Sequence, residues 1–179
     1  MTRRFEMRLA GTGGQGAILA GIILADAAIR EGKTVVQTQS YGPEARGGAS
    51  RSEIVISADE IDYPKVLEPD VTLCMSQEAC DRYGRQTRPG GLLVIDSDHV
   101  SRAATTQAVR VPLTSLAREV TGRAIAANVV GLGVLAGLTG IVSRESLEQA
   151  VEAHVPAGTG DLNLRALAAG YEEARLIKG

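Results

Sequence analysis

Short apolar runs alternate along the chain with longer stretches in which apolar residues recur at helical spacing. Short runs rich in Val, Ile and Leu are typical of buried strands, and the longer stretches are typical of helices. Strands are predicted over residues 5–10, 34–38, 52–57, 71–75, 92–95 and 108–111. Helices are predicted over residues 17–30, 77–83, 114–121, 126–138, 143–153 and 161–176. This alternation predicts an α/β fold of three layers, in which helices cover both faces of a mainly parallel sheet.

The strand over residues 52–57 departs from the alternation because no clear helix precedes it. A parallel pairing with the preceding strand would need a long crossover, whereas an antiparallel pairing needs only a loop. A mixed sheet therefore remains open. Cap signals mark the ends of several helices: Gly32 is expected to end the first helix, and Ser143 and Asp161 are N-cap candidates for the last two.

Two of the predicted helices have almost no polar face. Residues 17–25 are apolar or glycine throughout, and the helix over residues 126–138 has the same character. A surface helix would show a polar stripe, so both must be covered on nearly all sides. We expect them to pack on each other and also against a partner subunit, and we expect the isolated chain to form a homodimer.

An uncharged segment over residues 124–142 is nearly long enough to span a membrane. It also contains Asn128 and several glycines, and its Ala and Gly content makes it weakly hydrophobic for a span. A buried helix in a tight packing site is therefore the better interpretation, and no membrane association is expected.

The composition describes one domain without a nucleic-acid surface. The chain has 179 residues, which we interpret as a single domain over residues 1–179. The net charge of −2 and the 3% aromatic content argue against nucleic acid as a partner.

Cys74 and Cys80 are too few for a four-iron cluster and are expected to be buried apolar residues. The apolar stretch near the N-terminus is too short for a signal peptide, so a cytoplasmic protein is expected.

A glycine-rich loop follows the first strand and opens the first helix. Its residues fit the pattern GxGxxG, and the candidate binding residues are Gly11, Thr12, Gly13, Gly14, Gln15 and Gly16. The amides at the start of a helix favour a phosphate or pyrophosphate, but a tight turn without a ligand explains the glycines equally well. We expect a β-branched residue at Gly13 or Gly16 to damage the turn. NAD is disfavoured because no acidic residue ends the second strand and the first to follow is Glu44.

A second loop, over residues 40–50, is too elaborate for a plain turn. Its candidate binding residues are Tyr41, Gly42, Glu44, Arg46, Gly47 and Gly48. At the carboxyl end of the second strand it would lie beside the glycine loop. Arg46 is suited to bind a phosphate or carboxylate in a bidentate manner, although a brace between Glu44 and Arg46 remains an alternative. A third loop, over residues 76–78, is expected to open on the same edge.

Signals for catalysis within this chain are weak. His99 and His154 lie outside these loops and are interpreted as surface or capping residues. The sequence contains no nucleophile elbow, zinc motif, Walker A motif or GDG motif for thiamine diphosphate. We therefore assign no catalytic residue and no metal ligand to this chain.

The paired loops over residues 11–16 and 40–50 resemble the gamma subunit of 2-oxoacid:ferredoxin oxidoreductases. Further matching positions are Ile61-Asp62-Tyr63-Pro64, Pro69-Asp70, Ser76-Gln77, Asn128, Asn163, Ala166 and Gly170. The resemblance therefore spans most of the chain and describes it as one gamma-type domain. Within the family, the run from Tyr41 to Ser50 looks most like the 2-oxoglutarate branch.

The resemblance implies a complex in which other subunits hold the cofactors. A 2-oxoacid is oxidatively decarboxylated with thiamine diphosphate and Mg²⁺, electrons pass through an iron–sulfur cluster to ferredoxin, and coenzyme A takes the acyl group. This chain would bind none of the cofactors alone, and the glycine loop and Arg46 would help shape the coenzyme A side of the site. A free-standing Rossmann-type nucleotide-binding oxidoreductase and a stand-alone scaffold are the alternatives.

Overall fold

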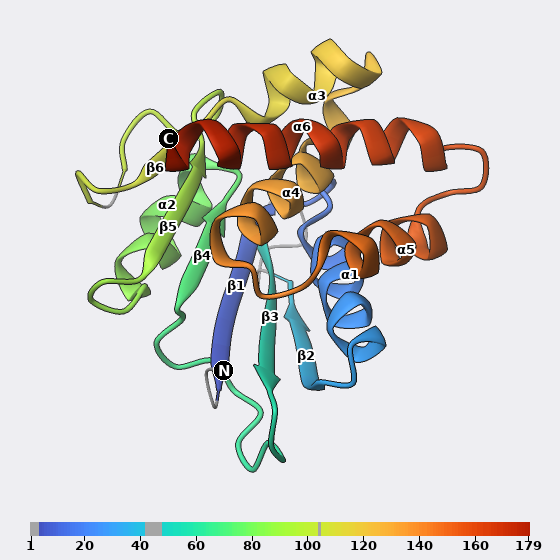
Figure 1. The fold of residues 1–179 in the computed structure, drawn as a ribbon. Coiled ribbons are helices and arrows are strands. Elements are labelled where there is room, and N and C mark those ends of the chain that lie inside the picture. The colour runs from blue at the N-terminus through green and yellow to red at the C-terminus, as the bar shows by residue number, and fades with distance from the viewer. Residues whose placement is uncertain (1–3, 42–47, 104) are drawn as a thin grey trace.

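A mixed sheet of six strands forms the centre of the computed structural model, which describes residues 4–41, 48–103 and 105–179 (Figure 1). The strands are β1 (Phe5–Thr12), β2 (Thr34–Ser40), β3 (Ala49–Ser57), β4 (Val71–Cys74), β5 (Leu92–Asp96) and β6 (Val109–Val111). Their order across the sheet is β2-β3-β1-β4-β5-β6. β1, β4, β5 and β6 are parallel, and β3 runs antiparallel to both of its neighbours. The mixed sheet that the 52–57 strand left open is thus confirmed.

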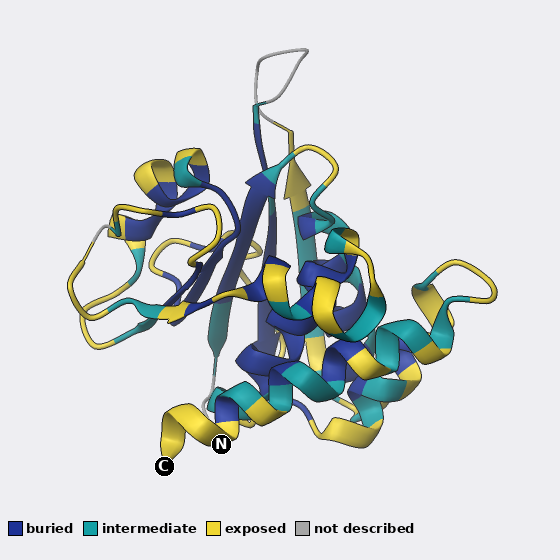
Figure 2. Ribbon diagram, turned by 90° about the horizontal axis from the view of Figure 1, so that it is seen from above, coloured by how far each residue is buried: buried dark blue, intermediate teal, exposed yellow. Residues whose placement is uncertain are grey.

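Helices cover both faces of the sheet, as predicted (Figure 1). They are α1 (Ala17–Arg30), α2 (Gln77–Tyr83), α3 (Leu113–Thr121), α4 (Ala127–Thr139), α5 (Arg144–His154) and α6 (Gly160–Lys178), with 3₁₀ turns η1 (Gly84–Gln86) and η2 (Ala124–Ala126). The larger apolar core lies between the sheet and the helices α1 and α4. A smaller core lies between the sheet and α2 (Figure 2). Cys74 and Cys80 are buried in the smaller core, as expected.

The apolar helices α1 and α4 are covered by other helices of the same chain. α5 packs on α1, and α6 packs on α4 along much of its length (Figure 1). Every residue of α4 from Ala127 to Ala136 is buried. The two helices also contact each other, as expected. α1 is covered less completely, because Ile18, Leu19 and Ile22 are half-buried and Ile29 is 58% exposed. The partner subunit that we expected to share in covering the two helices stays a prediction.

Close packing of α4 on α6 depends on glycine at the crossing. A Cβ atom on Gly133 would lie 2.3 Å from the carbonyl oxygen of Leu167, and one on Gly170 would lie 2.1 Å from the carbonyl oxygen of Val130. Two helices whose backbones approach this closely leave no room for a side chain between them. The buried, tightly packed helix predicted for the uncharged segment is confirmed. In the part of the chain that the structure describes, no helix is long and apolar enough to cross a membrane.

The cap predictions hold at two of the three positions. Gly32 has φ 73°, and its N–H and that of Lys33 bond the last carbonyls of α1. The Ser143 hydroxyl accepts a hydrogen bond from the N–H of Ser146 at 3.2 Å, so Ser143 is the N-cap of α5. The prediction for Asp161 is wrong, because α6 begins one residue earlier and the carboxylate lies in its first turn, where it still suits the helix dipole.

Candidate functional site

The glycine loop connects β1 to α1 at the carboxyl edge of the parallel strands. Gly11 and Thr12 still belong to β1, and the chain then turns through Gly14 at φ 87° and Gly16 at φ 77°. Both φ values lie in the left-handed region that glycine tolerates best. Gly16 is the N-cap of α1 and has no side chain with which to cap it. The first-turn amides of α1 are therefore left for a ligand or a neighbouring polypeptide.

The side chain of Gln15 ties this loop to the sheet. Its Oε1 accepts a hydrogen bond from the N–H of Thr12 at 2.7 Å, and its Nε2 donates to the carbonyl of Met75 at 2.8 Å. A Cβ atom on Gly11 would lie 2.6 Å from the same Oε1, so the amide folds over a residue without a side chain. Gln15 and the amide of Thr12 are thus engaged within the loop. Their predicted role in binding a ligand stays a prediction.

Asn128 fixes the other end of the loop, and the site prediction missed it. Its Nδ2 donates to the carbonyl of Gly16 at 3.2 Å, and its Oδ1 accepts from the N–H of Val129 at 2.9 Å. The residue is buried at the start of α4, with 4% of its surface exposed. A polar amide in an otherwise apolar and uncharged segment was the available signal, because a buried polar side chain needs a partner.

A hollow of about 380 Å³ opens beside the glycine loop, between the ends of β1 and β4 and the helices α3 and α4. Its lining residues are Thr12, Gly14, Gln15, Met75, His99, Thr114, Arg118, Ala124, Ile125 and Ala127. The connection from β1 through α1 covers one face of the sheet, and the connection from β4 through α2 covers the other. The hollow therefore lies at the topological switch point between β1 and β4, which is where α/β sheets commonly bind ligands.

Two side chains of this hollow carry chemistry that sequence reasoning did not assign to it. Arg118 of α3 is exposed and has no ion pair with any residue that the structure describes. His99, interpreted as lying apart from the loops, follows β5 and lines the same hollow. Its position was hidden because the parallel register brings the end of β5 to the edge where β1 ends. An unpaired guanidinium beside a glycine-rich loop favours an anionic ligand.

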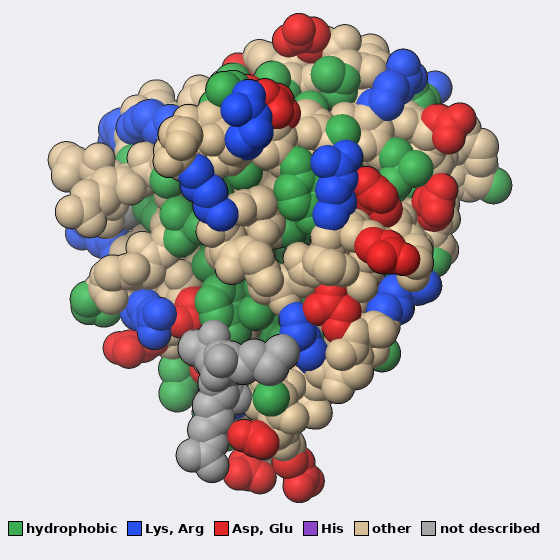
Figure 3. All heavy atoms as spheres, viewed as in Figure 1, with side chains coloured by type: hydrophobic (Ala, Val, Ile, Leu, Met, Phe, Trp, Pro, Cys, Tyr) green, Lys and Arg blue, Asp and Glu red, His purple; other side chains and the backbone are tan. Residues whose placement is uncertain are grey.

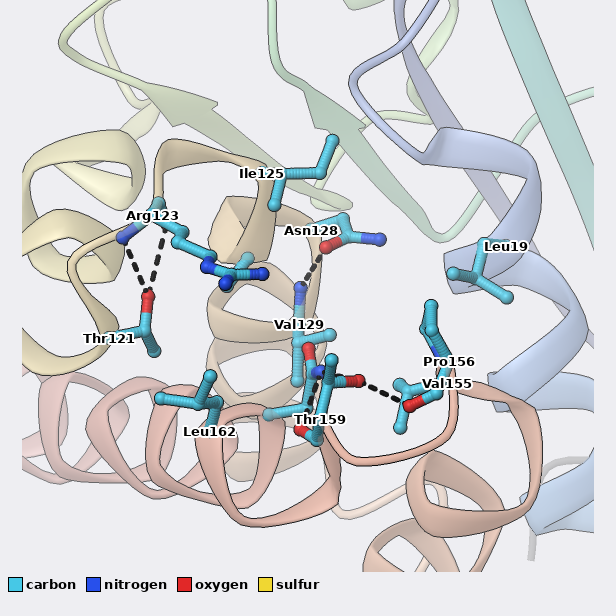
Figure 4. A pocket seen from close by; sticks show the side chains of 12 residues that line it. Leu19, Thr121, Arg123, Ile125, Asn128, Val129, Val155, Pro156, Thr159 and Leu162 are labelled. Carbon is cyan, nitrogen blue, oxygen red and sulfur yellow. Dashed lines mark hydrogen bonds between the residues drawn. The ribbon is translucent and has the colours of Figure 1, made fainter.

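A second, smaller hollow of about 170 Å³ lies behind Ile125 (Figure 4). Its lining is mostly apolar and comes from α1, the α3–α4 connection and the start of α6. Figure 4 shows Arg123 extending toward the hollow from the side opposite Leu19. Ile125 is 59% exposed and lines both hollows, so the two are neighbours on this edge.

The second predicted loop begins and ends at the same edge as the glycine loop. Register pairs Thr12 with Ala49 and Ser40 with Arg51, so the second loop enters β3 directly beside the end of β1. Tyr41 is 70% exposed, and Gly48 is half-buried next to Ala49. The remaining candidates, Gly42, Glu44, Arg46 and Gly47, lie outside the described residues.

The third predicted loop reaches the base of the second. The N–H of Ala49 donates to a carboxylate oxygen of Glu78 at 3.4 Å, which confirms that residues 76–78 open on this edge. Ser76 is the N-cap of α2, because its hydroxyl accepts from the N–H of Ala79 at 3.2 Å. Over residues 4–41, 48–103 and 105–179, no group of three or more His, Cys, Asp or Glu side chains could hold a metal ion.

Comparisons with known proteins agree with this fold and these loops. A family model described as pyruvate ferredoxin/flavodoxin oxidoreductase matches residues 6–173. The 2-oxoglutarate synthase subunit KorC of Methanocaldococcus jannaschii is 50% identical over 177 residues, covering 96% of this chain and 95% of the relative. The ketoisovalerate oxidoreductase subunit VorA of Methanothermobacter thermautotrophicus is 39% identical, covering 95% of this chain and 36% of the relative. The gamma subunit of a keto/oxoacid ferredoxin oxidoreductase from Geobacter sulfurreducens has a TM-score of 0.86 at 44% identity, covering 96% of this chain and 99% of that one.

The chain therefore belongs to the pyruvate ferredoxin/flavodoxin oxidoreductase family. Within that family it is similar to gamma subunits of 2-oxoacid:ferredoxin oxidoreductases, and to the KorC subunits of 2-oxoglutarate synthase in particular. The resemblance predicted from the two loops is thus confirmed, and a free-standing Rossmann-type oxidoreductase is not favoured.

Proposed function

We propose that this chain is the gamma-type subunit of a complex that oxidatively decarboxylates 2-oxoglutarate to its acyl-CoA and reduces ferredoxin. The observation that carries the proposal is the paired loops at one sheet edge, in a chain that matches KorC over nearly its full length. The reaction couples loss of CO₂ and transfer of two electrons to formation of a thioester. Thiamine diphosphate with Mg²⁺ and an iron–sulfur cluster would supply that chemistry from other subunits.

This chain's own contribution is to build one wall of the site. The hollow at the switch point offers the glycine loop and the unpaired guanidinium of Arg118. These groups fit the phosphates of coenzyme A, which are anionic. The second loop carries Arg46 and extends from the same edge. The amides of Gln15 and Asn128 hold the glycine loop in one conformation, so the wall is formed before a ligand arrives.

The role of Arg46 is tested in the assembled enzyme with steady-state kinetics. Arg46→Ala is expected to raise the Michaelis constant for coenzyme A roughly tenfold or more, because one charge-assisted contact contributes about 1.5–3 kcal/mol. The constant for 2-oxoglutarate should change little, because its carboxylate would be bound near thiamine on another subunit. Arg85→Ala, a substitution in η1, is the control. An unchanged constant for coenzyme A in an intact complex would leave Arg46 as a brace within its loop.

The runner-up function is a free-standing nucleotide-binding oxidoreductase, and it makes a different prediction. Titration of the isolated chain with NAD(H), NADP(H), FAD and FMN should show no tight binding. β2 ends without an acidic residue to hold a ribose, which supports this expectation. Micromolar binding of any of these, or turnover without partners, would favour the runner-up instead.

The setting of the chain follows from the same proposal. Its partners would be a thiamine-binding subunit and a cluster-bearing subunit, with ferredoxin as the acceptor of the complex, and the reaction would take place in the cytoplasm. A raised pKa at Cys74, caused first by its hydrogen bond with Cys80 and then by burial, keeps that thiol neutral. A homodimer of the isolated chain stays a prediction.

A further inference from the structure

The β3–β4 loop, residues 58–70, lies at the end of the sheet opposite the glycine loop (Figure 1). It contains the run Ile61-Asp62-Tyr63-Pro64, for which the proposed site has no use. β1 has eight residues between the two ends, so about 25 Å separates this loop from the glycine loop. The loop has no regular secondary structure, and a surface segment of this kind is a common place for binding function.

The start of β1 holds the backbone of the loop in place. The guanidinium of Arg4 donates to the carbonyl of Tyr63 at 2.7 Å and to that of Lys65 at 2.9 Å. The carboxylate of Glu6 accepts from the N–H of Leu67 at 2.9 Å and from the next N–H at 3.3 Å. Arg4 and Glu6 also pair with each other at 2.7 Å. Hydrogen bonds at four backbone positions hold this irregular loop in one conformation. The loop would therefore lose less conformational entropy when it binds a partner.

This fixed backbone presents two large apolar side chains to solvent. Val66 points inward and is 5% exposed, whereas Tyr63 is 47% exposed and Leu67 is 64% exposed. Leu67 lies between two open grooves, the larger of about 820 Å³, and Tyr63 lines that larger groove. Apolar side chains held rigidly beside a groove are the usual anchors of a protein interface.

The charge around these anchors indicates what kind of surface they meet. The exposed charged residues of the loop are Asp59, Glu60, Asp62, Glu68 and one lysine, Lys65, whereas Asp70 is buried and pairs with Arg88. Figure 3 shows acidic side chains gathered at the lower tip of the molecule, where the β3–β4 connection projects in Figure 1. An acidic rim repels nucleic acid and anionic bilayers. In a symmetric pair of copies joined through this tip, the two acidic rims would face each other.

We propose that the β3–β4 loop is a docking element that inserts Tyr63 and Leu67 into an apolar socket with a basic rim on a partner subunit. The inference rests on the proposed function, because the partner is a subunit of the same complex. It adds a second contact to that assembly, remote from the coenzyme A wall. Variants in the loop should therefore weaken assembly and leave the kinetics of the assembled fraction unchanged.

Assembly of the co-expressed complex tests the inference. We titrate the tagged full chain with the thiamine-binding and cluster-bearing subunits. Mass photometry measures the dissociation constant of this chain from those subunits. Tyr63→Ser/Leu67→Ser should weaken association roughly 30-fold or more, as loss of central interface anchors does. The conservative variant Tyr63→Phe/Leu67→Met should associate about as tightly as the wild type. Glu60→Gln/Asp62→Asn should weaken association several-fold at low salt and reduce its dependence on salt.

A matched control separates docking from a general loss of apolar surface. Ile29→Ser/Leu176→Ser removes side chains that are 58% and 57% exposed on α1 and α6, and it should leave association unchanged. If the wild-type chain assembles and Tyr63→Ser/Leu67→Ser assembles equally well, the docking inference is wrong and the proposed function stands. If the wild-type chain does not associate with these subunits at all, the proposed function itself fails. Self-association lost in the same variant would instead identify a second copy as the occupant.

Discussion

Gly13 and Gly16 belong to the same loop, but only Gly16 lacks room for a side chain. A Cβ atom there would lie 2.4 Å from Nδ2 of Asn128, and its φ is 77°. Gly13 has no atom within 4 Å of its Cβ position and does not have a positive φ. The geometry therefore supports the expected damage at Gly16 and removes the reason for it at Gly13.

The two glycines make a matched pair for urea unfolding. Gly16→Ala is expected to lower the free energy of unfolding by about 1–3 kcal/mol, because it adds a left-handed strain and a clash with Asn128. Gly13→Ala should stay within about 0.5 kcal/mol of the wild type. Equal losses at both positions would mean that the loop differs from this description.

At this scale the sequence predicted the glycine loop but not what holds it. The pattern GxGxxG after a strand is a local signal, and it was sufficient to place residues 11–16. The contact of Asn128 with Gly16 joins residues 112 positions apart, so no local pattern contains it. The sequence shows that Gln15 belongs to the loop, but it does not show that the side chain bonds Thr12 and Met75, so its role in binding a ligand stays a prediction.

At the scale of elements, the crossing of α4 and α6 leaves no room for a side chain at its glycines. Gly170→Ala is expected to lower the free energy of unfolding by about 2–3 kcal/mol, because the added methyl meets the backbone of α4. Gly160→Ala is the control, since its Cβ position at the start of α6 is open. Chemical denaturation measures both. A tolerated substitution at Gly170 would show that the two helices can separate without loss.

The junction between α1 and α5 predicts a dependence of stability on acid. Burial alone would raise the pKa of Glu31, but hydrogen bonds from Lys33 and Ser143 lower it to about 2. A carboxyl with a depressed pKa stabilises the fold fully above its unfolded value near 4.5, and this contribution is lost as the pH falls toward 2.

Glu31→Gln tests this junction. At pH 7 the substitution should lower the free energy of unfolding by about 1 kcal/mol, because it removes a charge-assisted hydrogen bond at a partly exposed site. The difference from the wild type should shrink as the pH falls from 4.5 to 3. Glu152→Gln, on the exposed side of α5, is the control. A difference that stays constant over this range would contradict the assignment.

Most elements could be predicted because each carries its own apolar period, and their arrangement could be predicted only in part. The absence of a helix before β3 left its antiparallel pairing open, and the structure places β3 between β1 and β2. The docking of α5 on α1 and of α6 on α4 depends on contacts far apart in the chain, so no local pattern predicts it.

At the scale of the whole molecule, the two ends of the sheet have different proposed roles. The carboxyl edge of the sheet gathers the glycine loop, the base of the second loop and the hollow lined by Arg118 and His99. The opposite edge presents the β3–β4 loop to a partner. The sequence indicated that role because its two loops match a family, and their chemistry alone left other functions open.

The most direct measurement is the rate of ferredoxin reduction by the co-expressed complex, with and without this chain. With 2-oxoglutarate and coenzyme A present, the full set of subunits should be active and omission of this chain should abolish activity. The value of kcat/KM should be higher for 2-oxoglutarate than for pyruvate or 2-oxoisovalerate. Full activity without this chain, or preference for another 2-oxoacid, would contradict the account.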